Sequence, residues 1–245
     1  MDATFLTSAL RGVEAVCHLA GVGDVYLAAR EPLTAVQGNV AATTLLLQSA
    51  AAAGVRRFVF ASTWEVYGPP RYQPIDEEHP TAPDHPYNIT KLGAEMMGVA
   101  LSHSLSTPFV SLRLGTAYGG AMRASSVFRI FADRARSGQP LTIKGTGEQF
   151  RQFTHVDDIA EAFRLALPDA APSGCYNIVA PEKTSIRQLA EALIARLGGS
   201  VVFEPARAAD IAPSEVTARR AELALGWRAA IPFAEGLDRL LQDMA

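Results

Sequence analysis

The stretch Arg57-Phe58-Val59-Phe60-Ala61-Ser62 decides the fold of this chain. It is a short apolar run, which is typical of a strand buried on both faces of a parallel sheet. Similar runs occur at Ala15–Gly21 and Phe109–Leu114, and the spacing of apolar residues between them predicts helices over Leu33–Ala53 and Tyr87–Ser104. Because strands alternate with helices at these distances, the chain is predicted to be α/β, with a parallel sheet and helices packed on its faces.

The second half of the chain has a more broken pattern. It predicts helices at about 125–137, 156–167, 185–197 and 233–243, with short strands at 141–144, 176–179 and 201–203. Ser185 and Gln188 form the sequence pattern of a capping box at the start of the third of these helices. The change in pattern near residue 120 predicts a sheet domain over residues 1–120 and a smaller lobe over residues 121–245, covering the carboxyl edge of the sheet.

The composition excludes several classes of protein. The chain has 245 residues, of which 49% are hydrophobic and 19% charged, so it can bury a sizeable core and is neither disordered nor fibrous. The formal net charge is −3 and no stripe of Lys and Arg stands out, so we expect no nucleic-acid partner and no membrane-surface partner. No run approaches the ~18 apolar residues of a membrane span, and the first residues do not resemble a signal peptide.

The two cysteines point to a reducing compartment. Cys17 and Cys175 lie far apart in the sequence, and neither belongs to a Cys-x-x-Cys pair. Cys17 falls in an apolar strand, where a buried and inert thiol is predicted. We therefore expect a cytoplasmic protein without disulfides, and no set of metal-ligating residues stands out.

The sharpest local motif is Tyr87-Asn88-Ile89-Thr90-Lys91. A Tyr and a Lys four residues apart lie on one face of a helix. An ammonium beside a phenol favours the phenolate, so Lys91 is predicted to lower the pKa of Tyr87 toward the working pH. Such a Tyr can give or take a proton. The alternative is a partly exposed aromatic residue that happens to lie beside a charge.

A second motif follows the strand that decides the fold. The segments Gly21–Asp24, Ser62–Gly68 and Gly115–Gly120 leave the carboxyl ends of strands, where parallel α/β sheets bind ligands. In the second of these segments, the hydroxyls of Ser62 and Thr63 are placed to hydrogen-bond a reacting oxygen, and Glu65 can act as a base if its pKa is raised. The alternative is that Ser and Thr cap the strand end and Glu65 is simply solvated.

Together these motifs resemble the extended short-chain dehydrogenase/reductases, in particular the NAD-dependent epimerase/dehydratase family, whose members act on nucleotide sugars. The matching segments cover nearly the whole chain in order: His18-Leu19-Ala20-Gly21, Asn39, Ser62-Thr63 with Glu65-Val66-Tyr67-Gly68, Tyr87 with Lys91, Arg113-Leu114-Gly115-Thr116-Ala117-Tyr118-Gly119, Gly147 to Asp158, and Leu225-Gly226-Trp227 with Gly236-Leu237. The resemblance implies a Rossmann-like sheet with a C-terminal substrate-binding lobe.

The resemblance also implies a role for each matching residue. Tyr87 is the acid/base, Lys91 holds its pKa and the nicotinamide ribose, and Thr63 hydrogen-bonds the reacting hydroxyl, with Glu65 acting on the sugar after oxidation at C4. The resemblance places NAD or NADP against Asp2, Leu19, Ala20, Gly21, Ala61, Ser62, Tyr87 and Lys91. It places the nucleotide sugar against Thr63, Trp64, Thr116, Arg151 and Arg207, with Arg151 on the diphosphate and Arg113 and Arg207 adding positive charge.

Three positions depart from the family pattern. Trp64 stands where family 4,6-dehydratases commonly have the Asp that protonates the leaving hydroxyl, and an indole cannot replace it. That exchange disfavours dehydratase chemistry and affects epimerase or decarboxylase chemistry less. Thr116 stands where the family often has an Asn that contacts the substrate, and Gln152 stands where an Asp often follows the Arg.

The start of the sequence departs most from the family. No Gly-rich turn precedes residue 15, although the family binds the cofactor pyrophosphate at such a turn, and Asp2-Ala3-Thr4 aligns with the tail of the family's third strand. The resemblance implies that roughly 50–60 residues of the family pattern are missing, more than one βαβ unit. Either the chain is a fragment, or it is a natural short relative. We expect weak NAD(P) binding, because the main anion site is missing.

Three functions follow from these observations. The first is an NAD(P)-dependent nucleotide-sugar epimerase or dehydratase-like enzyme. The second is a cofactor-free enzyme that uses Tyr87 and Glu65 for non-redox acid/base chemistry. The third is a non-catalytic module that binds a nucleotide sugar or a protein. The missing unit would also leave the Ala15–Gly21 strand without one neighbour, so we expect self-association, most simply as a homo-oligomer.

Overall fold

A four-stranded parallel sheet forms the centre of the computed structural model, which describes residues 2–120, 122–206 and 214–244. Its strands lie in the order β1-β2-β3-β8, with bounds β1 Ala15–His18, β2 Arg57–Thr63, β3 Phe109–Leu114 and β8 Gly174–Ile178. Every residue of β2 is buried, as expected for an apolar strand between two parallel neighbours. The predicted α/β class and parallel sheet are confirmed.

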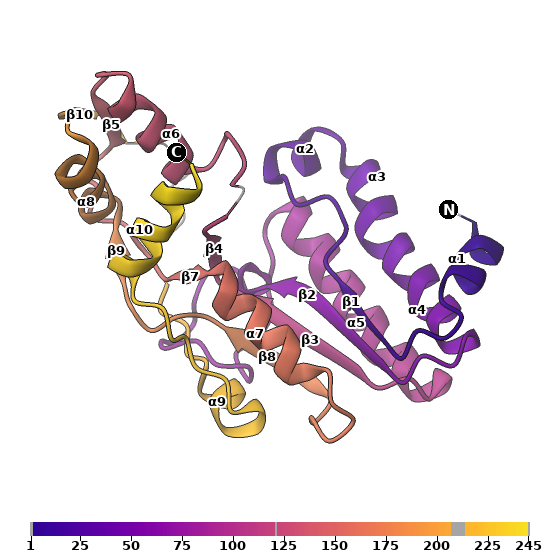
Figure 1. Ribbon diagram of the computed structural model, residues 1–245. Helices are drawn as coiled ribbons and strands as arrows, with labels where there is room; N and C mark the ends of the chain where they lie inside the picture. The colour runs from indigo at the N-terminus through magenta and orange to yellow at the C-terminus, as the bar shows by residue number, and fades with distance from the viewer. Residues whose placement is uncertain (1, 121, 207–213, 245) are drawn as a thin grey trace.

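Helices lie on both faces of the sheet (Figure 1), and alternate residues of β2 pack against the two layers. Phe58 and Phe60 pack with residues of α4 and α5, whereas Val59 and Ala61 pack with residues of α7 and α9. The first layer contains α2 Val25–Arg30, α3 Pro32–Ala35, η1 Val36–Ala41, α4 Ala42–Ala52 and α5 Pro86–Leu105. The second contains α7 Val156–Ala166 and α9 Arg219–Leu225. The sheet is therefore covered on both faces.

The long helix predicted over Leu33–Ala53 is present but interrupted. Its middle turn, η1, is a π-helix that contains Gly38 and the buried Asn39. Single π turns inside α-helices are frequent at functional sites. The side chain of Asn39 is used at the candidate site described below.

The second half of the chain builds a separate aromatic core. Tyr118, Phe128, Phe153 and Phe233 stack on one another there. The elements around them are β4 Thr116–Tyr118, α6 Val127–Arg136, β5 Leu141–Lys144, β6 Phe150–Arg151, β7 Phe153–His155, β9 Thr184–Ser185, α8 Ile186–Leu197, β10 Val201–Glu204 and α10 Phe233–Asp243, and the predicted capping box at α8 is present. β8 joins the central sheet, and α7 and α9 pack on one of its faces, so residues after 120 also help to build the sheet domain. A domain boundary near residue 120 therefore stays a prediction.

Two expectations about the first part of the chain, up to the edge strand β1, are wrong. Cys17 is exposed rather than buried, because its side chain shares a face with Val59 and the helices on that face contact β3 and β8 instead of β1. Asp2 does not end a strand: its carboxylate accepts hydrogen bonds from the backbone N–H groups of Thr4 and Phe5 and caps α1 Ala3–Ala9. Among the described residues, β1 pairs only with β2, as expected for an edge. Within the same residues, each helix is too short or too polar to cross a bilayer.

Candidate active site

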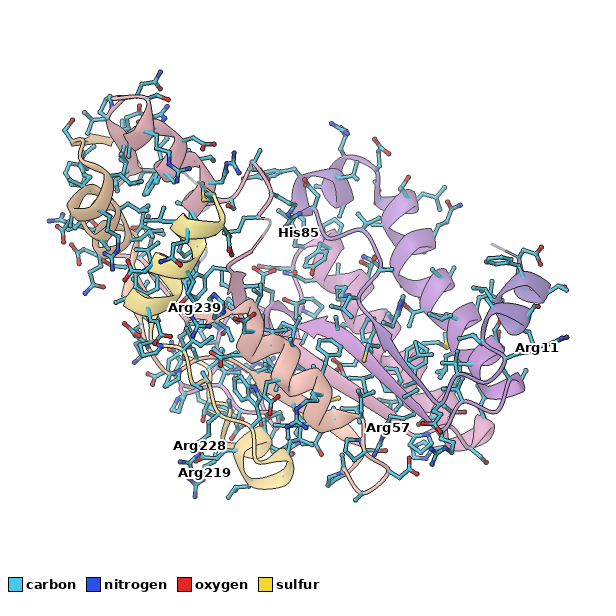
Figure 2. The ribbon with its side chains drawn as sticks, viewed as in Figure 1. Arg11, Arg57, His85, Arg219, Arg228 and Arg239 are labelled. Atoms are coloured by element: carbon cyan, nitrogen blue, oxygen red, sulfur yellow. The ribbon has the colours of Figure 1, made fainter. Side chains whose placement is uncertain are left out.

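Tyr87 and Lys91 lie in the first turns of α5, at the carboxyl end of the sheet. His85 caps this helix through its side chain, which accepts a hydrogen bond from the Tyr87 N–H at 3.2 Å, and Pro86 occupies its first position. Figure 2 shows His85 near the junction with the smaller lobe, and the buried Arg57 near the opposite end of the sheet. Lys91 is 7% exposed, and its Nζ lies 4.4 Å from the ring centroid of Phe60 on β2. The predicted pair therefore stands beside the strand that decides the fold.

Burial controls the ionisation of both side chains. Desolvation lowers the pKa of Lys91 to about 8, and the negative charge of Glu95 partly opposes this. Desolvation raises the pKa of Tyr87 to about 12, and the charge of Glu65 raises it further while Arg123 lowers it. The sequence predicted the opposite direction for Tyr87, because it counted the charge of Lys91 and not the burial of the phenol. Tyr87 is accordingly a protonated phenol in this structure.

Thr63 and Glu65 follow directly from the end of β2. The Thr63 hydroxyl accepts a hydrogen bond from the Glu65 N–H at 3.3 Å and caps the short helix η2 Trp64–Tyr67. The capping alternative is therefore present for Thr63. Glu65 is not simply solvated: burial raises the pKa of its carboxyl group, and the positive charge of Arg151 lowers it in part. No hydrogen bond joins the Tyr87 hydroxyl to Thr63 or Lys91 in the described part of the chain.

A pocket next to Glu65 collects most of the predicted substrate-binding residues. It is lined by Trp64, Thr116, Phe150, Arg151, Gln152, Val179, Ser214 and Val216. Trp64, Thr116 and Arg151 were predicted as substrate contacts, whereas Arg207 lies outside the described residues. Gln152 closes one wall, because its amide bonds both the N–H and the C=O of Val216. The charge of Glu65 raises the pKa of Tyr87, and the charge of Arg151 lowers the pKa of Glu65, so these charges are coupled across the end of β2.

Asn39 connects the loop after β1 to the Tyr-Lys helix. Its side chain bonds the N–H and C=O of Val22 at 2.7 and 3.0 Å and donates to the Thr90 hydroxyl at 2.9 Å. A Cβ on Gly21 would lie 2.5 Å from the Asn39 Oδ1, so only glycine fits there. Through Asn39, the π-helical turn thus holds this loop beside α5. Leu19, which precedes Gly21 after the end of β1, is 60% exposed.

The described residues fit one half of a dinucleotide cofactor. The Lys91 Nζ has no hydrogen-bond acceptor among them although the side chain is buried, and Leu19, Ala20 and Gly21 are exposed at the end of β1. A nicotinamide ribose suits such a donor beside an exposed strand end. Asp2, which the resemblance placed against the cofactor, has its carboxylate engaged in capping α1.

Two arginines behave differently from the sequence expectation. Arg113 does not add free positive charge to the pocket, because it is buried in an ion pair with Glu95. Arg123 was not predicted, yet it donates to the Gly23 C=O at 3.0 Å and its charge lowers the pKa of Tyr87. Its position just after the Gly115–Gly120 segment, at a strand's carboxyl end, was the available signal.

The buried His18 on β1 lets us predict how the free energy of unfolding responds to acid. The imidazole is 5% exposed and bonds the Thr43 hydroxyl at 2.8 Å. Desolvation, aided by the charge of Lys91, lowers the pKa of His18 to about 4. Between pH 6.5 and about 4 the unfolded chain binds a proton that the folded chain refuses, so the free energy of unfolding falls as pH falls through that window. Urea unfolding at pH 7 and pH 5 measures this fall.

The matched variant is His18→Gln, whose amide keeps the bond to Thr43 without titrating. We expect its free energy of unfolding to change less between pH 7 and pH 5 than that of the wild type. His103→Gln, at an exposed position in the last turn of α5, is the control. An equal pH response in wild type and His18→Gln would show that His18 does not carry the effect.

Comparisons of this chain with known proteins agree on one family. Residues 1–179 match the model of the NAD dependent epimerase/dehydratase family. UDP-glucose 4-epimerase of Mycolicibacterium smegmatis is 28% identical over 235 residues, which cover 94% of this chain and 75% of that protein. The crystal structure of UDP-glucose 4-epimerase from Thermotoga maritima with UDP-glucose superposes with a TM-score of 0.91 at 27% identity, over 99% of this chain and 81% of that one.

A second solved structure carries the cofactor. UDP-glucuronic acid 4-epimerase from Bacillus cereus, in complex with UDP-glucuronic acid and NAD, superposes with a TM-score of 0.90 at 25% identity, over 100% of this chain and 80% of that one. The fold, the Tyr-Lys pair at the end of the sheet and the match over residues 1–179 agree. This chain belongs to the NAD-dependent epimerase/dehydratase family.

Proposed function

We propose that this protein is an NAD(P)-dependent enzyme that acts on a nucleotide sugar, with Tyr87 and Lys91 as its acid/base pair. One observation carries the proposal: Tyr87 and the buried Lys91 lie at the start of α5 beside β2, and the segment that follows β2 contributes Trp64 to a pocket whose wall also holds Thr116 and Arg151. The charge interactions of Glu65 with Tyr87 and with Arg151 support the view that both parts serve one substrate.

Each residue then has a chemical task. To act as the base, the phenol of Tyr87 first gives up its proton, and the ammonium of Lys91 stabilises the resulting phenolate. The phenolate takes the proton of a sugar hydroxyl when that hydroxyl is oxidised, and the phenol returns the proton on reduction. Bound NAD or NADP would supply the hydride acceptor. Thr63 orients the reacting hydroxyl, and Arg151 holds the diphosphate through charge-assisted hydrogen bonds. Trp64 offers no titratable proton, which favours epimerase or decarboxylase chemistry over elimination of a hydroxyl.

The second candidate is non-redox acid/base chemistry at the same place. It is favoured by the raised pKa of Glu65, whose charge acts directly on Tyr87. A binding module without catalysis is the third candidate. It is supported only by the pocket itself.

Calorimetric titration separates these candidates. UDP- and dTDP-sugars are expected to bind in the micromolar to millimolar range, and NAD is titrated with and without them. Binding of NAD that strengthens with the nucleotide sugar supports the redox enzyme. Binding of the sugar with no effect of NAD supports the second or third candidate. No detectable heat with any nucleotide sugar at millimolar concentration would overturn the proposal.

We also propose that the protein forms a homo-oligomer and works in the reducing cytoplasm, where the free thiols of Cys17 and Cys175 persist. The helix α5 presents Ile89, Met96 and Met97 to solvent, at exposures of 52%, 62% and 40%. These residues share a helix face, and contiguous apolar surface of this kind favours association. A second copy of the chain, which carries the same apolar face, fits it with twofold symmetry.

Size exclusion with light scattering tests this proposal. Met96→Glu is expected to shift the wild type from oligomer to monomer at micromolar concentration, because it places a carboxylate in the contact. Leu223→Glu, at a 72% exposed position on α9, is the matched control and should change nothing. If Met96→Glu has no effect, deuterium exchange at Val16 and Leu19 tests the β1 edge instead. A monomeric wild type with rapid exchange there would refute self-association altogether.

A further inference from the structure

A buried ion pair lies one helical turn beyond Lys91. Glu95 on α5 and Arg113 on β3 have side chains that are 3% and 7% exposed. The Glu95 carboxylate accepts from Arg113 Nε at 3.2 Å and Nη2 at 2.5 Å, and from the Ser111 hydroxyl at 2.7 Å. Burial tends to raise the pKa of Glu95, but these bonds and the charge of Arg113 outweigh it and hold that pKa below its usual value. Glu95 is therefore a buried anion.

The ion pair is fixed by further hydrogen bonds. Arg113 Nη1 donates to the Tyr67 hydroxyl at 2.8 Å, and that hydroxyl donates to Asn177 Oδ1 at 2.7 Å. The Asn177 amide in turn donates to the C=O of Thr217, next to the pocket wall. Both Glu95 oxygens are engaged, so the carboxylate cannot turn to bond Lys91. Any effect on Lys91 must act through charge across one turn of α5.

Among the described residues, Glu95 is the anion whose charge acts on the buried Lys91. The strand β2 contributes the neutral ring of Phe60, and β1 contributes His18, which is neutral at pH 7 because its pKa is lowered to about 4. The strand β3 contributes the cation Arg113, and α5 itself contributes the protonated Tyr87 and the anion Glu95. The charge of Glu95 opposes the desolvation of Lys91. Without it, Lys91 and Arg113 would both be buried cations lacking this anion.

We propose that Glu95 is a positioning residue, held in place by Arg113 and Ser111, that keeps Lys91 charged and thereby ready to stabilise the Tyr87 phenolate. The catalytic meaning of this role rests on the proposed function, but the effect on Lys91 does not. A purely structural ion pair would stabilise the fold without setting the charge of Lys91. The two roles are separable because they predict different titrations.

The chain has three lysines, Lys91, Lys144 and Lys183, so carbon-13 NMR of the Cε resonances follows each of them during a pH titration of the whole protein. The Lys91 resonance is assigned by its loss in Lys91→Met. In Glu95→Gln, the Lys91 midpoint is expected to fall by about one pH unit, or roughly tenfold in the protonation constant. Glu161→Gln, which removes an exposed carboxylate on α7, is the control and should leave it unchanged.

Glu95→Gln leaves Arg113 buried without an anion and can fail to fold. The double variant Glu95→Gln/Arg113→Met removes both charges and keeps the site neutral. Because the charge of Glu95 acts on Lys91 across one turn of α5, the Lys91 midpoint is expected to fall in this variant too, by a smaller amount. A folded double variant whose Lys91 midpoint equals that of the wild type would overturn the proposal. The titration needs no substrate, so its outcome is independent of whether a nucleotide sugar is turned over.

Discussion

Tyr87→Phe is expected to lower the turnover of a nucleotide sugar by about 10²–10⁴-fold, the usual contribution of a positioned acid/base group. The ring stays and only the hydroxyl is lost. In the described residues that hydroxyl makes no hydrogen bond, so its removal leaves no buried partner unsatisfied and the fold should be retained. Proton NMR of the sugar nucleotide measures the rate, and circular dichroism with a thermal melt checks the fold.

Tyr26→Phe is the matched control for this variant. Tyr26 lies on α2 and is 72% exposed, so losing its hydroxyl should change neither turnover nor stability. Full activity in Tyr87→Phe would remove Tyr87 from the reaction. It would leave Glu65 as the remaining group with a shifted pKa beside the pocket.

Arg151→Ala is expected to weaken the binding of a nucleotide sugar by about 10–100-fold, because a hydrogen bond to a charged group contributes about 1.5–3 kcal/mol. Arg151 lines the pocket and its charge lowers the pKa of Glu65. The same substitution should therefore raise the pKa of Glu65 further and shift any Glu65-dependent pH profile upward. The affinity for the sugar nucleotide is measured by calorimetry at two salt concentrations.

Arg164→Ala provides the comparison, since Arg164 is an exposed residue of α7 paired with Glu161, outside the pocket lining. It should leave the affinity unchanged. A dissociation constant for the nucleotide sugar that is the same in Arg151→Ala and wild type would separate Arg151 from the diphosphate.

The elements predicted correctly from the sequence are those whose signal is local. β2 and β3 are short, largely apolar runs because both of their faces are covered, and Ser185 with Gln188 marked the start of α8. α1 and α9 were not predicted as helices, because each has seven residues, too few for a clear period. The exposure of Cys17 could not be predicted, because it depends on which strands α7 and α9 cover.

The candidate site shows the same division between local and distant causes. Trp64, Thr116 and Arg151 were chosen by motif, and they line one pocket. The opposite wall was not predicted, because Gln152 and Val216 are 64 residues apart and only the fold brings them together. The direction of the Tyr87 pKa shift was wrong for a related reason: the sequence shows that a Lys is present but not how deeply the phenol is buried.

The most direct test of the central claim is turnover by the whole protein. UDP-glucose, UDP-glucuronic acid, UDP-N-acetylglucosamine and dTDP-glucose are each incubated with the protein and saturating NAD, and the anomeric proton signals are followed by NMR. We expect at least one of these nucleotide sugars to give new signals with the wild type and none with Tyr87→Phe. A folded wild-type protein that binds these sugars and NAD yet leaves all four unchanged would contradict the account.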